Sequence, residues 1–363
     1  MRSQYFSVVV SALLLTACGT APPQPPSADA LGAHPYPTSA GPYPVGDDVV
    51  SVLYRGEVAF PAIMALIRGA RASVAVEMYE VQRTDLVEAM MAARARGVGV
   101  TVITDPTVDA SLLSAARLRS AGVEVVLYPV RRMMIDHVKL LVIDAGEVAV
   151  TGGINWGNAS AGHHDVDLLV RGPAARNLAR VVERDLVTAG RPGTVSPERP
   201  DTAIQVVATL PSADIRPPIR AAIDSATARI DLELYVLTDL GIVHALERAA
   251  ARGVRLRVLL DPTERPSDAA ATELRARGIP VRLYRGRGEL LHAKTMVTDG
   301  RTVIAGSANW SAGGFARNHE VDLVLDDAPA VAAVFTQAAD ADWAASGSNG
   351  GFSGPAAGDA EAA

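Results

Sequence analysis

The stretch His137-Val-Lys-Leu-Leu-Val-Ile-Asp144 returns later in the chain as His292-Ala-Lys-Thr-Met-Val-Thr-Asp299. Each copy has a His two residues before a Lys and seven residues before an Asp. Residues two apart on a β-strand share a face, so we expect each imidazole to lie beside the ammonium of its own motif. This pairing suits a phosphate, because the ring can attack or protonate while a positive charge holds the oxygens.

Lysine usage supports a special role for these two stretches. Lys139 and Lys294 are the only lysines in the chain, and every other Lys or Arg position holds an arginine. This usage indicates a site that needs a compact ammonium and not a planar guanidinium. The alternative interpretation is two ordinary strands that each carry a polar pair, but it does not explain two copies at matched places in a repeat.

The motifs belong to a duplication within the chain. Glu77-Met-Tyr79 recurs as Glu233-Leu-Tyr235, and Asp105-Pro-Thr107 recurs as Asp261-Pro-Thr263. The offset is 156 for the second pair (261 − 105) and 155 for the motif histidines (292 − 137). A shared order at a near-constant offset places one motif in each half.

Strand patterns alternate with helix patterns in the first half. We expect strands near residues 73–78, 98–105, 123–128, 148–151 and 165–170, and helices near 85–96, 110–120 and 173–188. This order predicts an α/β fold made of two duplicated α/β/α sandwich halves with mainly parallel sheets. The predicted halves span residues 49–190 and 204–343, with a linker at 191–203 and a disordered tail at 344–363.

The N-terminus has the pattern of a secretory signal peptide over residues 1–17, with a positive start and an apolar run too short to span a bilayer. The end of that run resembles a lipobox, which would make Cys18 the lipidated first residue. A plain signal peptide with an incidental Cys is the alternative. Residues 18–48, rich in proline, are expected to form a tether. The sequence thus predicts an extracytoplasmic, membrane-anchored bacterial lipoprotein or a secreted protein.

Composition limits the other possibilities. The formal net charge of −6 provides no broad basic surface for a nucleic-acid backbone, although a local basic groove is compatible with it. The single cysteine excludes a framework of internal disulfides. No cluster in the sequence competes with the two motifs as a metal site, so neither a metal nor another cofactor is expected.

The two stretches resemble the signature of the phospholipase D superfamily, H-x-K-x4-D followed by a G-[GS]-x-N turn. The corresponding turns here are Gly152-Gly-Ile-Asn155 and Gly306-Ser-Ala-Asn309. The resemblance extends from about residue 50 to residue 343. It implies two halves packed about a pseudo-twofold axis, with one active site between them and no metal requirement.

The resemblance also implies residue roles. His137 would be the nucleophile that forms a phosphohistidine, and His292 would be the general acid and then the base. The other matching positions are the phosphate-binding Lys139, Lys294, Asn155 and Asn309, the His-orienting Asp165 and Glu320, and the motif carboxylates Asp144 and Asp299. We expect the motif carboxylates to anchor local structure. Asp165 stands where the family usually has Glu, so its contact with a His would need a small strand shift.

Several histidines and tryptophans have two interpretations. Trp156 and Trp310 each follow the Asn of a turn, and either flank the cleft or pack the turn. His163 and His164 either line the cleft or, as we expect, face solvent. His244 lies in a helical pattern and is expected to be structural.

Two further pairs of residues occupy equivalent places in the halves. Arg132 and Arg287 lie five residues before each motif His, and are expected to add positive charge at the mouth of the site. Glu77 and Glu233 are expected to be buried partners near the phosphate site.

Three functions share these motifs. A phospholipase D or phosphatidyltransferase acting on phospholipids is favoured by the acidic chain, by the expected lipid anchor to a membrane, and by a resemblance of residues 152–173 to the first half of cardiolipin synthases. An extracytoplasmic nuclease is the second interpretation, with nucleic acid as a less favoured partner. A binding module without catalysis is the third, and two complete motifs argue against it. The enzyme is expected to act as a monomer.

Overall fold

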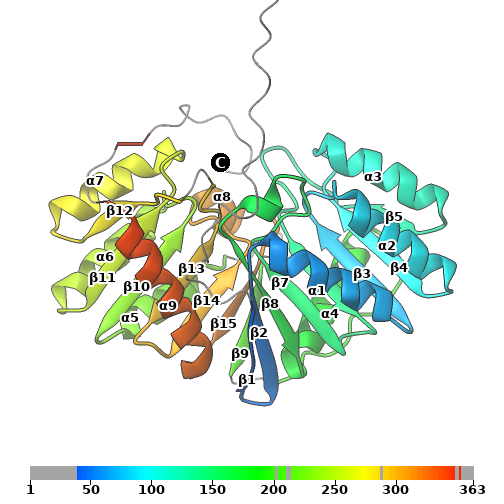
Figure 1. Cartoon of the computed structure of the whole chain (residues 1–363), viewed down its shortest axis with the longest axis horizontal. Helices are drawn as coiled ribbons and strands as arrows, with labels where there is room; N and C mark the ends of the chain where they lie inside the picture. Colours follow the sequence, from blue (N-terminus) through cyan, green and yellow to red (C-terminus); the bar gives the residue numbers. More distant parts are fainter. Residues whose placement is uncertain (1–38, 201–202, 210–213, 287–288, 348–350, 353–363) are drawn as a thin grey trace, which may run out of the picture. The chain divides into compact units, whose positions relative to one another are not determined.

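The computed structural model describes residues 39–200, 203–209, 214–286, 289–347 and 351–352. Figure 1 shows two β-sheets, each with its own helices. The predicted signal peptide, Cys18 and most of the predicted tether lie outside the described residues.

The first half is built on an eight-stranded sheet with the order β1-β2-β8-β7-β6-β3-β4-β5. Its strands are β1 (Ser39–Val45), β2 (Asp48–Tyr54), β3 (Ser73–Met78), β4 (Gly99–Thr104), β5 (Glu124–Leu127), β6 (Lys139–Ile143), β7 (Val148–Gly152) and β8 (Val166–Arg171). Its helices are α1 (Gly56–Gly69), α2 (Thr84–Ala95), α3 (Asp109–Ser120), the short 3-10 turn η2 (Ser160–Gly162) and α4 (Pro173–Thr188).

The second half repeats this plan on a seven-stranded sheet with the order β12-β11-β10-β13-β14-β15-β9. Its strands are β9 (Ile204–Ala208), β10 (Arg229–Leu234), β11 (Arg255–Leu260), β12 (Val281–Leu283), β13 (Lys294–Thr298), β14 (Thr302–Gly306) and β15 (Val321–Leu325). Its helices are α5 (Arg216–Ser225), α6 (Leu240–Ala251), the 3-10 turn η3 (Arg265–Ser267), α7 (Asp268–Ala276), α8 (Ala312–Ala316) and α9 (Pro329–Ala345). The two mixed sheets and their helices agree with the predicted duplicated α/β fold.

Helices cover both faces of the first sheet because its strands are apolar on both sides. On one face Ile63 of α1 and Leu86 of α2 pack with Val76 and Val102 of the strands. The opposite face packs against α4 through residues such as Leu178, in a core that also includes residues of the second half. By packing on both faces, the helices fix the positions of the strands, and the motifs lie at the ends of two of these strands.

The expectation of mainly parallel sheets is wrong. In the first sheet only the β3–β4 and β4–β5 pairs are parallel, and the other neighbours are antiparallel. The second sheet likewise has only β10–β11 and β11–β12 as parallel pairs. The physical reason is connection length. Helices α2 and α3 allow parallel crossovers, whereas the residues 144–147 between β6 and β7 leave room only for a hairpin.

The prediction of a tether up to residue 48 is also wrong for its last part. Ser39–Val45 forms strand β1, which pairs with β2 at the edge of the first sheet. Proline suggested a tether, but an edge strand tolerates Pro42 and Pro44 because one side of it needs no ladder hydrogen bonds. Helix α1 was not predicted, and α9 continues to Ala345 into the predicted tail.

The two halves share a core. Val166 and Leu168 of β8 belong to the same buried cluster as Val303 of β14 and Leu323 of β15. Helix α4 of the first half contacts β9 of the second, and α9 of the second half contacts β1 and β2 of the first. Because this shared apolar core excludes water, residues from both halves can meet in one buried site.

Candidate active site

The segments that carry the two motif histidines are held by backbone hydrogen bonds from the opposite half. The N–H of His137 donates to the carbonyl oxygen of His319 at 2.8 Å, and the N–H of His319 donates to that of Ile135 at 2.8 Å. In the same way, the N–H of His292 donates to the carbonyl oxygen of His164 at 2.9 Å. Each motif is therefore clamped by the residue that precedes the carboxylate of the other half.

The two predicted orienting carboxylates cross over between the halves. The Nδ1 atom of His137 lies 3.0 and 3.1 Å from the carboxylate oxygens of Glu320. The Nδ1 atom of His292 lies 2.6 Å from Oδ2 of Asp165, so the shorter Asp side chain reaches its partner. All four side chains are buried. A carboxylate at Nδ1 holds the proton on that nitrogen and leaves Nε2 for chemistry.

Both lysine ammonium groups fold back onto their own histidine. Lys139 donates to the backbone oxygen of His137 at 2.7 Å, and Lys294 donates to that of His292 at 2.6 Å. The Nζ atom of Lys294 also lies 3.0 and 3.1 Å from the two ring nitrogens of His292. Strands β6 and β13 begin at the lysines, so the histidines precede the strands. The alternation of side chains along a strand therefore does not explain the proximity of His and Lys.

The two motifs converge electrostatically at Asp322. Burial raises the pKa of Asp322 to about 7, and the positive charges of both Lys294 and Lys139 act against that increase. One carboxyl group thus interacts with the ammonium groups of both halves. This convergence is what a single site with two motifs requires.

The two turns that follow the motifs place buried amides beside this site. Asn155 and Asn309 are 5% and 1% exposed. In the first turn a Cβ at Gly153 would lie only 2.2 Å from Oδ1 of Asp165, so only glycine fits there. In the second turn Ser307 occupies that place and donates a 2.6 Å hydrogen bond to Glu320. The second residue of each turn, Gly153 or Ser307, thus lies against the carboxylate that is hydrogen-bonded to a motif histidine.

The pKa values of the two orienting carboxylates shift in opposite directions. Burial raises the pKa of Glu320 well above its usual value, although Lys139 and the Ser307 hydroxyl act in the opposite direction. Asp165 is also buried, but the positive charges of Lys294 and His292 outweigh burial and lower its pKa. The environment of Asp165 thus favours its ionised form, whereas the burial of Glu320 acts against ionisation.

Asp144 and Asp299 lie at the far ends of the motif strands, away from the histidines. Oδ1 of Asp144 accepts backbone hydrogen bonds from Ala72 and Ser73 at 2.7 and 2.9 Å. Asp299 accepts bonds of 2.8 Å from the backbone N–H groups of residues 227–229. Through these hydrogen bonds both aspartates connect the end of a motif strand to the start of a neighbouring strand, and so anchor local structure.

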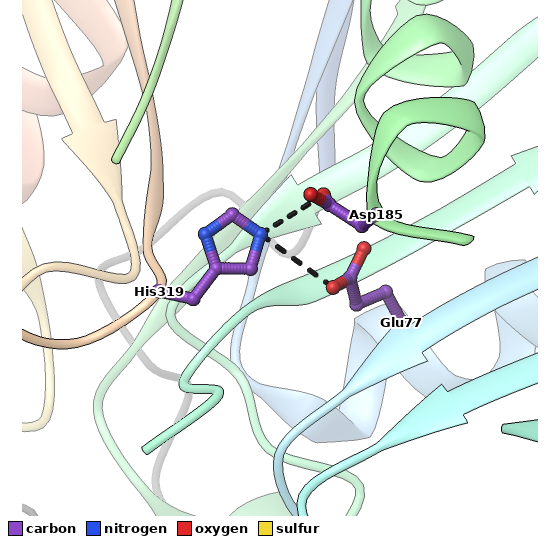
Figure 2. Close-up of side chains that lie close together, drawn as sticks. All are labelled: Glu77, Asp185 and His319. Atoms are coloured by element: carbon purple, nitrogen blue, oxygen red, sulfur yellow. Dashed lines mark hydrogen bonds and ion pairs between the residues drawn. The ribbon is translucent and has the colours of Figure 1, made fainter. Parts of the chain in front are cut away.

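A buried His–carboxylate cluster lies behind each motif. Figure 2 shows the first cluster, in which Nε2 of His319 lies 2.9 Å from Oδ2 of Asp185 and 3.5 Å from Oε1 of Glu77. In the second cluster Nε2 of His164 lies 3.0 Å from Oδ2 of Asp342, near Glu233. Each cluster takes its His from one half and its carboxylates from the other.

These clusters change the interpretation of several residues. His164 is buried, not solvated as expected, because Asp342 compensates the cost of burying it. His163 is only half-buried, and its ring centroid lies 5.7 Å from that of His292. Sequence reasoning assigned no role to His319, Asp185 or Asp342. The repeat could have revealed them, since His164 and His319 are 155 residues apart (319 − 164).

The same clusters offer ligand types that a divalent metal ion accepts, one imidazole nitrogen and two carboxylate oxygens. A third group of this kind is His244 with Glu247 and Glu273, at the surface of α6 and α7. In the first cluster, however, Arg184 already donates to Asp185 at 2.9 and 3.0 Å. That guanidinium supplies positive charge to Asp185, so the first cluster is an ion-pair network.

The remaining predicted residues are placed as follows. Trp156 and Trp310 are buried and pack the turns; they do not line a cleft. His244 is half-exposed on α6. Arg132 lines a surface pocket, and Arg287 lies outside the described residues.

The chain matches known proteins over most of its length. The profile of the family described as "Cardiolipin synthase, PLD-like domain" matches residues 63–186 and 219–343. Cardiolipin synthase of Geobacillus kaustophilus is 30% identical in an alignment 343 residues long that covers 81% of this chain and 67% of that protein. Cardiolipin synthase A of Pseudomonas putida is 29% identical in an alignment 319 residues long that covers 78% of this chain and 66% of that protein. The chain thus spans about two thirds of the length of these relatives.

A solved structure gives the same picture of the fold. The crystal structure of phosphatidylserine synthase from Haemophilus influenzae superposes with a TM-score of 0.62, covering 80% of this chain and 85% of that chain. Its sequence identity is 13%, so the likeness concerns the fold alone.

The relatives contradict the predicted localisation. Cardiolipin synthases are typically proteins of the inner membrane, which does not agree with an extracytoplasmic lipoprotein or a secreted protein. The prediction depended on a short apolar run and one cysteine. Such a pattern acts as a targeting signal that other proteins recognise, and the fold of the mature protein does not depend on it. Within the described residues, none of the helices combines the length and the apolar character needed to cross a bilayer.

Two independent findings agree. Each half contributes one complete motif to a site whose histidines, lysines and carboxylates interlock between the halves. The family profile covers both of these halves, and the relatives match them together. The chain therefore belongs to the cardiolipin synthase, phospholipase D-like family of the phospholipase D superfamily of enzymes.

Proposed function

We propose that this protein is a phosphodiesterase that hydrolyses a phospholipid or transfers its phosphatidyl group to an alcohol. The main support is the crossed pairing of the motifs, in which each His is held at Nδ1 by a carboxylate of the other half. With Nδ1 held by a carboxylate, Nε2 is the nitrogen of each ring that would act on the phosphate. The cardiolipin synthase relatives support a phospholipid as the substrate.

The proposed reaction has two displacements. In the first, Nε2 of His137 attacks the phosphorus, the bond from phosphorus to the leaving alcohol breaks, and His292 gives that oxygen its proton. In the second, His292 takes a proton from water or an acceptor alcohol, whose oxygen attacks the phosphorus and breaks the phosphorus–nitrogen bond. His137 then returns to its starting state.

The two carboxylates support this assignment of the histidines. A nucleophile must be a neutral imidazole, and Glu320, with its raised pKa, places less negative charge beside His137. A general acid must begin protonated, and ionised Asp165 at 2.6 Å stabilises a positive charge on His292. The contrast therefore favours His137 as nucleophile and His292 as acid and base.

The positive charges and amides would bind the oxygens that do not react. Lys139 and Lys294 would neutralise charge that builds on the phosphate, and Asn155 and Asn309 would donate hydrogen bonds from fixed turns. Their burial strengthens these interactions, because the surrounding dielectric is low.

The test uses the purified full chain with phosphatidylglycerol, phosphatidylcholine and single-stranded DNA. We expect release or exchange of a lipid headgroup. With phosphate-labelled lipid, His292→Ala should accumulate a covalent phosphoenzyme, and His137→Ala should form none. His244→Ala, on the surface of α6, is the matched control. Cleavage of DNA without headgroup release would contradict the proposal and favour a nuclease.

A further inference from the structure

Two turns of the sequence Asp-Pro-Thr, at residues 105–107 and 261–263, have no part in the reaction described above. Each turn follows a strand in the parallel part of its sheet, β4 in the first half and β11 in the second. In the first sheet Thr104 lies opposite Met78, which in turn lies opposite Lys139 at the start of its motif strand. The second sheet repeats this register. Both turns therefore lie at the edge of the sheet where the motif histidines are.

Each aspartate closes its own turn with one carboxylate oxygen. Oδ1 of Asp105 accepts a 2.6 Å hydrogen bond from the N–H of Thr107 and a short one from the hydroxyl of the same residue. Oδ1 of Asp261 accepts bonds of 2.7 and 2.5 Å from the N–H and the hydroxyl of Thr263. The proline between them fixes φ for such a turn and has no N–H that could compete. One oxygen of each carboxylate is thus held locally.

The second oxygen reaches the residue that precedes each motif histidine. Oδ2 of Asp105 accepts a 2.6 Å bond from the N–H of Asp136, and Oδ2 of Asp261 accepts a 2.7 Å bond from the N–H of Leu291. These contacts join residues 31 and 30 positions apart. Both aspartates are 0% exposed, so water cannot take the place of the backbone N–H. Each turn is therefore connected rigidly to the segment that leads into a motif.

Two consecutive N–H groups at each motif are held from different sides. The N–H of Asp136 bonds to its own half, whereas the next N–H, that of His137, donates to the carbonyl oxygen of His319 in the other half. The second motif repeats this arrangement, with the N–H of His292 donating to the carbonyl oxygen of His164. Two adjacent peptide planes held in this way fix the direction in which the histidine side chain leaves the backbone. The crossed carboxylate at Nδ1 then fixes the rotation of the ring.

We propose that Asp105 and Asp261 are positioning residues, each of which holds one motif histidine in place through the backbone of the residue before it. The inference rests on the proposed function for the task of each histidine. Asp105 would position the nucleophile His137, and Asp261 would position His292, the acid and base. A displacement of about 1 Å at a reacting group can lower a rate by about 10²-fold, so the loss of one backbone contact is enough to be measured.

The substitution of Asn for Asp breaks this contact without changing the size of the side chain. The amide has one oxygen, which the two donors of the threonine would retain. It would present its NH₂ group to the backbone N–H of Asp136 or Leu291, where two donors would face each other and the segment would shift. The test variants are therefore Asp105→Asn and Asp261→Asn.

The experiment compares kcat/KM for two lipids that differ only in the headgroup, phosphatidylglycerol and phosphatidyl-4-nitrophenol. In both, attack by Nε2 of His137 breaks the bond from phosphorus to the headgroup oxygen. The departing glycerol oxygen needs a proton from His292, whereas 4-nitrophenolate is stable without one. The value of kcat/KM covers the steps up to the phosphoenzyme, whichever step limits kcat.

We expect Asp105→Asn to lower kcat/KM by about 10²-fold with both lipids, since both need the nucleophile. Asp261→Asn should lower it by about 10²-fold with phosphatidylglycerol and by less than about tenfold with the nitrophenyl lipid. A role in stability alone would lower the rates with both lipids by one factor. Equal losses with both lipids in Asp261→Asn would therefore overturn the proposal. So would a loss below about threefold with phosphatidylglycerol in either variant.

Asp48→Asn is the matched control. Asp48 is also buried and also accepts a backbone hydrogen bond, at 2.9 Å from the N–H of Ala174. It precedes Val49, which pairs with Arg171 at the end of β8 that is remote from Asp165. We expect this variant to keep the kcat/KM of the unmodified protein with both lipids. Circular dichroism measures the folded fraction of every variant, to which the rates are normalised.

Thr107→Val and Thr263→Val replace an Asn variant that does not fold. Each removes only the hydroxyl bond to Oδ1, so the aspartate stays and is held less firmly. We expect losses of about tenfold or less, with the same dependence on the headgroup as in the corresponding Asn variant. A Thr263→Val variant whose losses do not depend on the headgroup would overturn the proposal.

A soluble substrate, bis(4-nitrophenyl) phosphate, separates this inference from the proposed function. Asp105→Asn should lower its kcat/KM by about 10²-fold as well, because its cleavage needs the nucleophile and no lipid. This loss in a protein that cleaves no phospholipid would support the positioning role and refute the lipid substrate. Headgroup release with unchanged kcat/KM in both Asn variants would support the reaction and refute the positioning role.

Discussion

The two halves repeat one another in topology but differ at the residues that contact the histidines. The first half supplies Asp165 and Gly153, and the second half supplies Glu320 and Ser307 at the matching places. Asp165 has a lowered pKa beside Lys294 and His292, whereas burial raises the pKa of Glu320. The two imidazoles therefore have unlike carboxylate partners, which under the proposed mechanism would suit them to opposite tasks.

The exchange of carboxylates also explains why neither half would be complete alone. His137 depends on Glu320, which is 183 residues away, and His292 depends on Asp165, which is 127 residues away. The buried clusters of His319 and His164 are exchanged in the same manner. The halves are therefore coupled by charge as well as by their shared apolar core.

The largest expected effect concerns the histidines themselves. His137→Ala and His292→Ala should each lower headgroup release by about 10⁴-fold or more, because each removes a group that forms or breaks a bond. Steady-state rates on phospholipid vesicles provide the measurement, with circular dichroism to establish that the variants fold. Substantial activity in either variant would mean that the two halves do not share the reaction.

The next effect concerns the exchanged clusters. Asp185→Ala and Asp342→Ala should each lower the free energy of unfolding by about 3–5 kcal/mol, because each removes the nearer carboxylate of a buried His. Urea denaturation at neutral pH measures this, and Asp224→Ala on the surface of α5 is the control. Losses below about 1 kcal/mol would show that the clusters do not couple the halves.

A smaller effect separates the two orienting carboxylates. Asp165→Asn removes a carboxyl group whose lowered pKa favours the ionised form, so we expect activity to fall by about 10²-fold or more. Glu320→Gln should cost less, since the pKa of Glu320 is already raised toward a neutral carboxyl. The rates of headgroup release by the two variants, measured at the same pH, test this difference. A larger loss for Glu320→Gln would reverse the assignment of nucleophile and acid.

The smallest effect is a dependence of stability on pH. Backbone hydrogen bonds outweigh the effect of burial and lower the pKa of Asp299 from 3.8 to about 2. A lowered pKa means that Asp299 stabilises the fold above about pH 4 and that this contribution is lost as the pH falls toward 2. Asp299→Asn should therefore cost about 2 kcal/mol at neutral pH and almost nothing near pH 2. An unchanged cost in urea denaturation at both pH values would contradict the anchoring role.

Much of the fold could be predicted because its signals are local. Alternating apolar strands and amphipathic helices placed β3 at Ser73–Met78 and α4 at Pro173–Thr188 as the structure has them. The sequence analysis did not use the short connection after β6, which makes β7 antiparallel to it. It also interpreted β1 as a tether because of its prolines. Short connections and edge positions depend on neighbours in space, which periodicity does not describe.

The chemical groups of the site and their occurrence in two copies can be read from the residues alone. His137, Lys139 and their counterparts follow from spacing and from the reservation of lysine for two positions. The pairing of Glu320 with His137 and of Asp165 with His292 depends on the folded chain, because those contacts join residues more than 120 positions apart. The direction in which each carboxyl pKa shifts depends on the fold too, because burial and nearby cations cause the shift and neither can be read from the sequence.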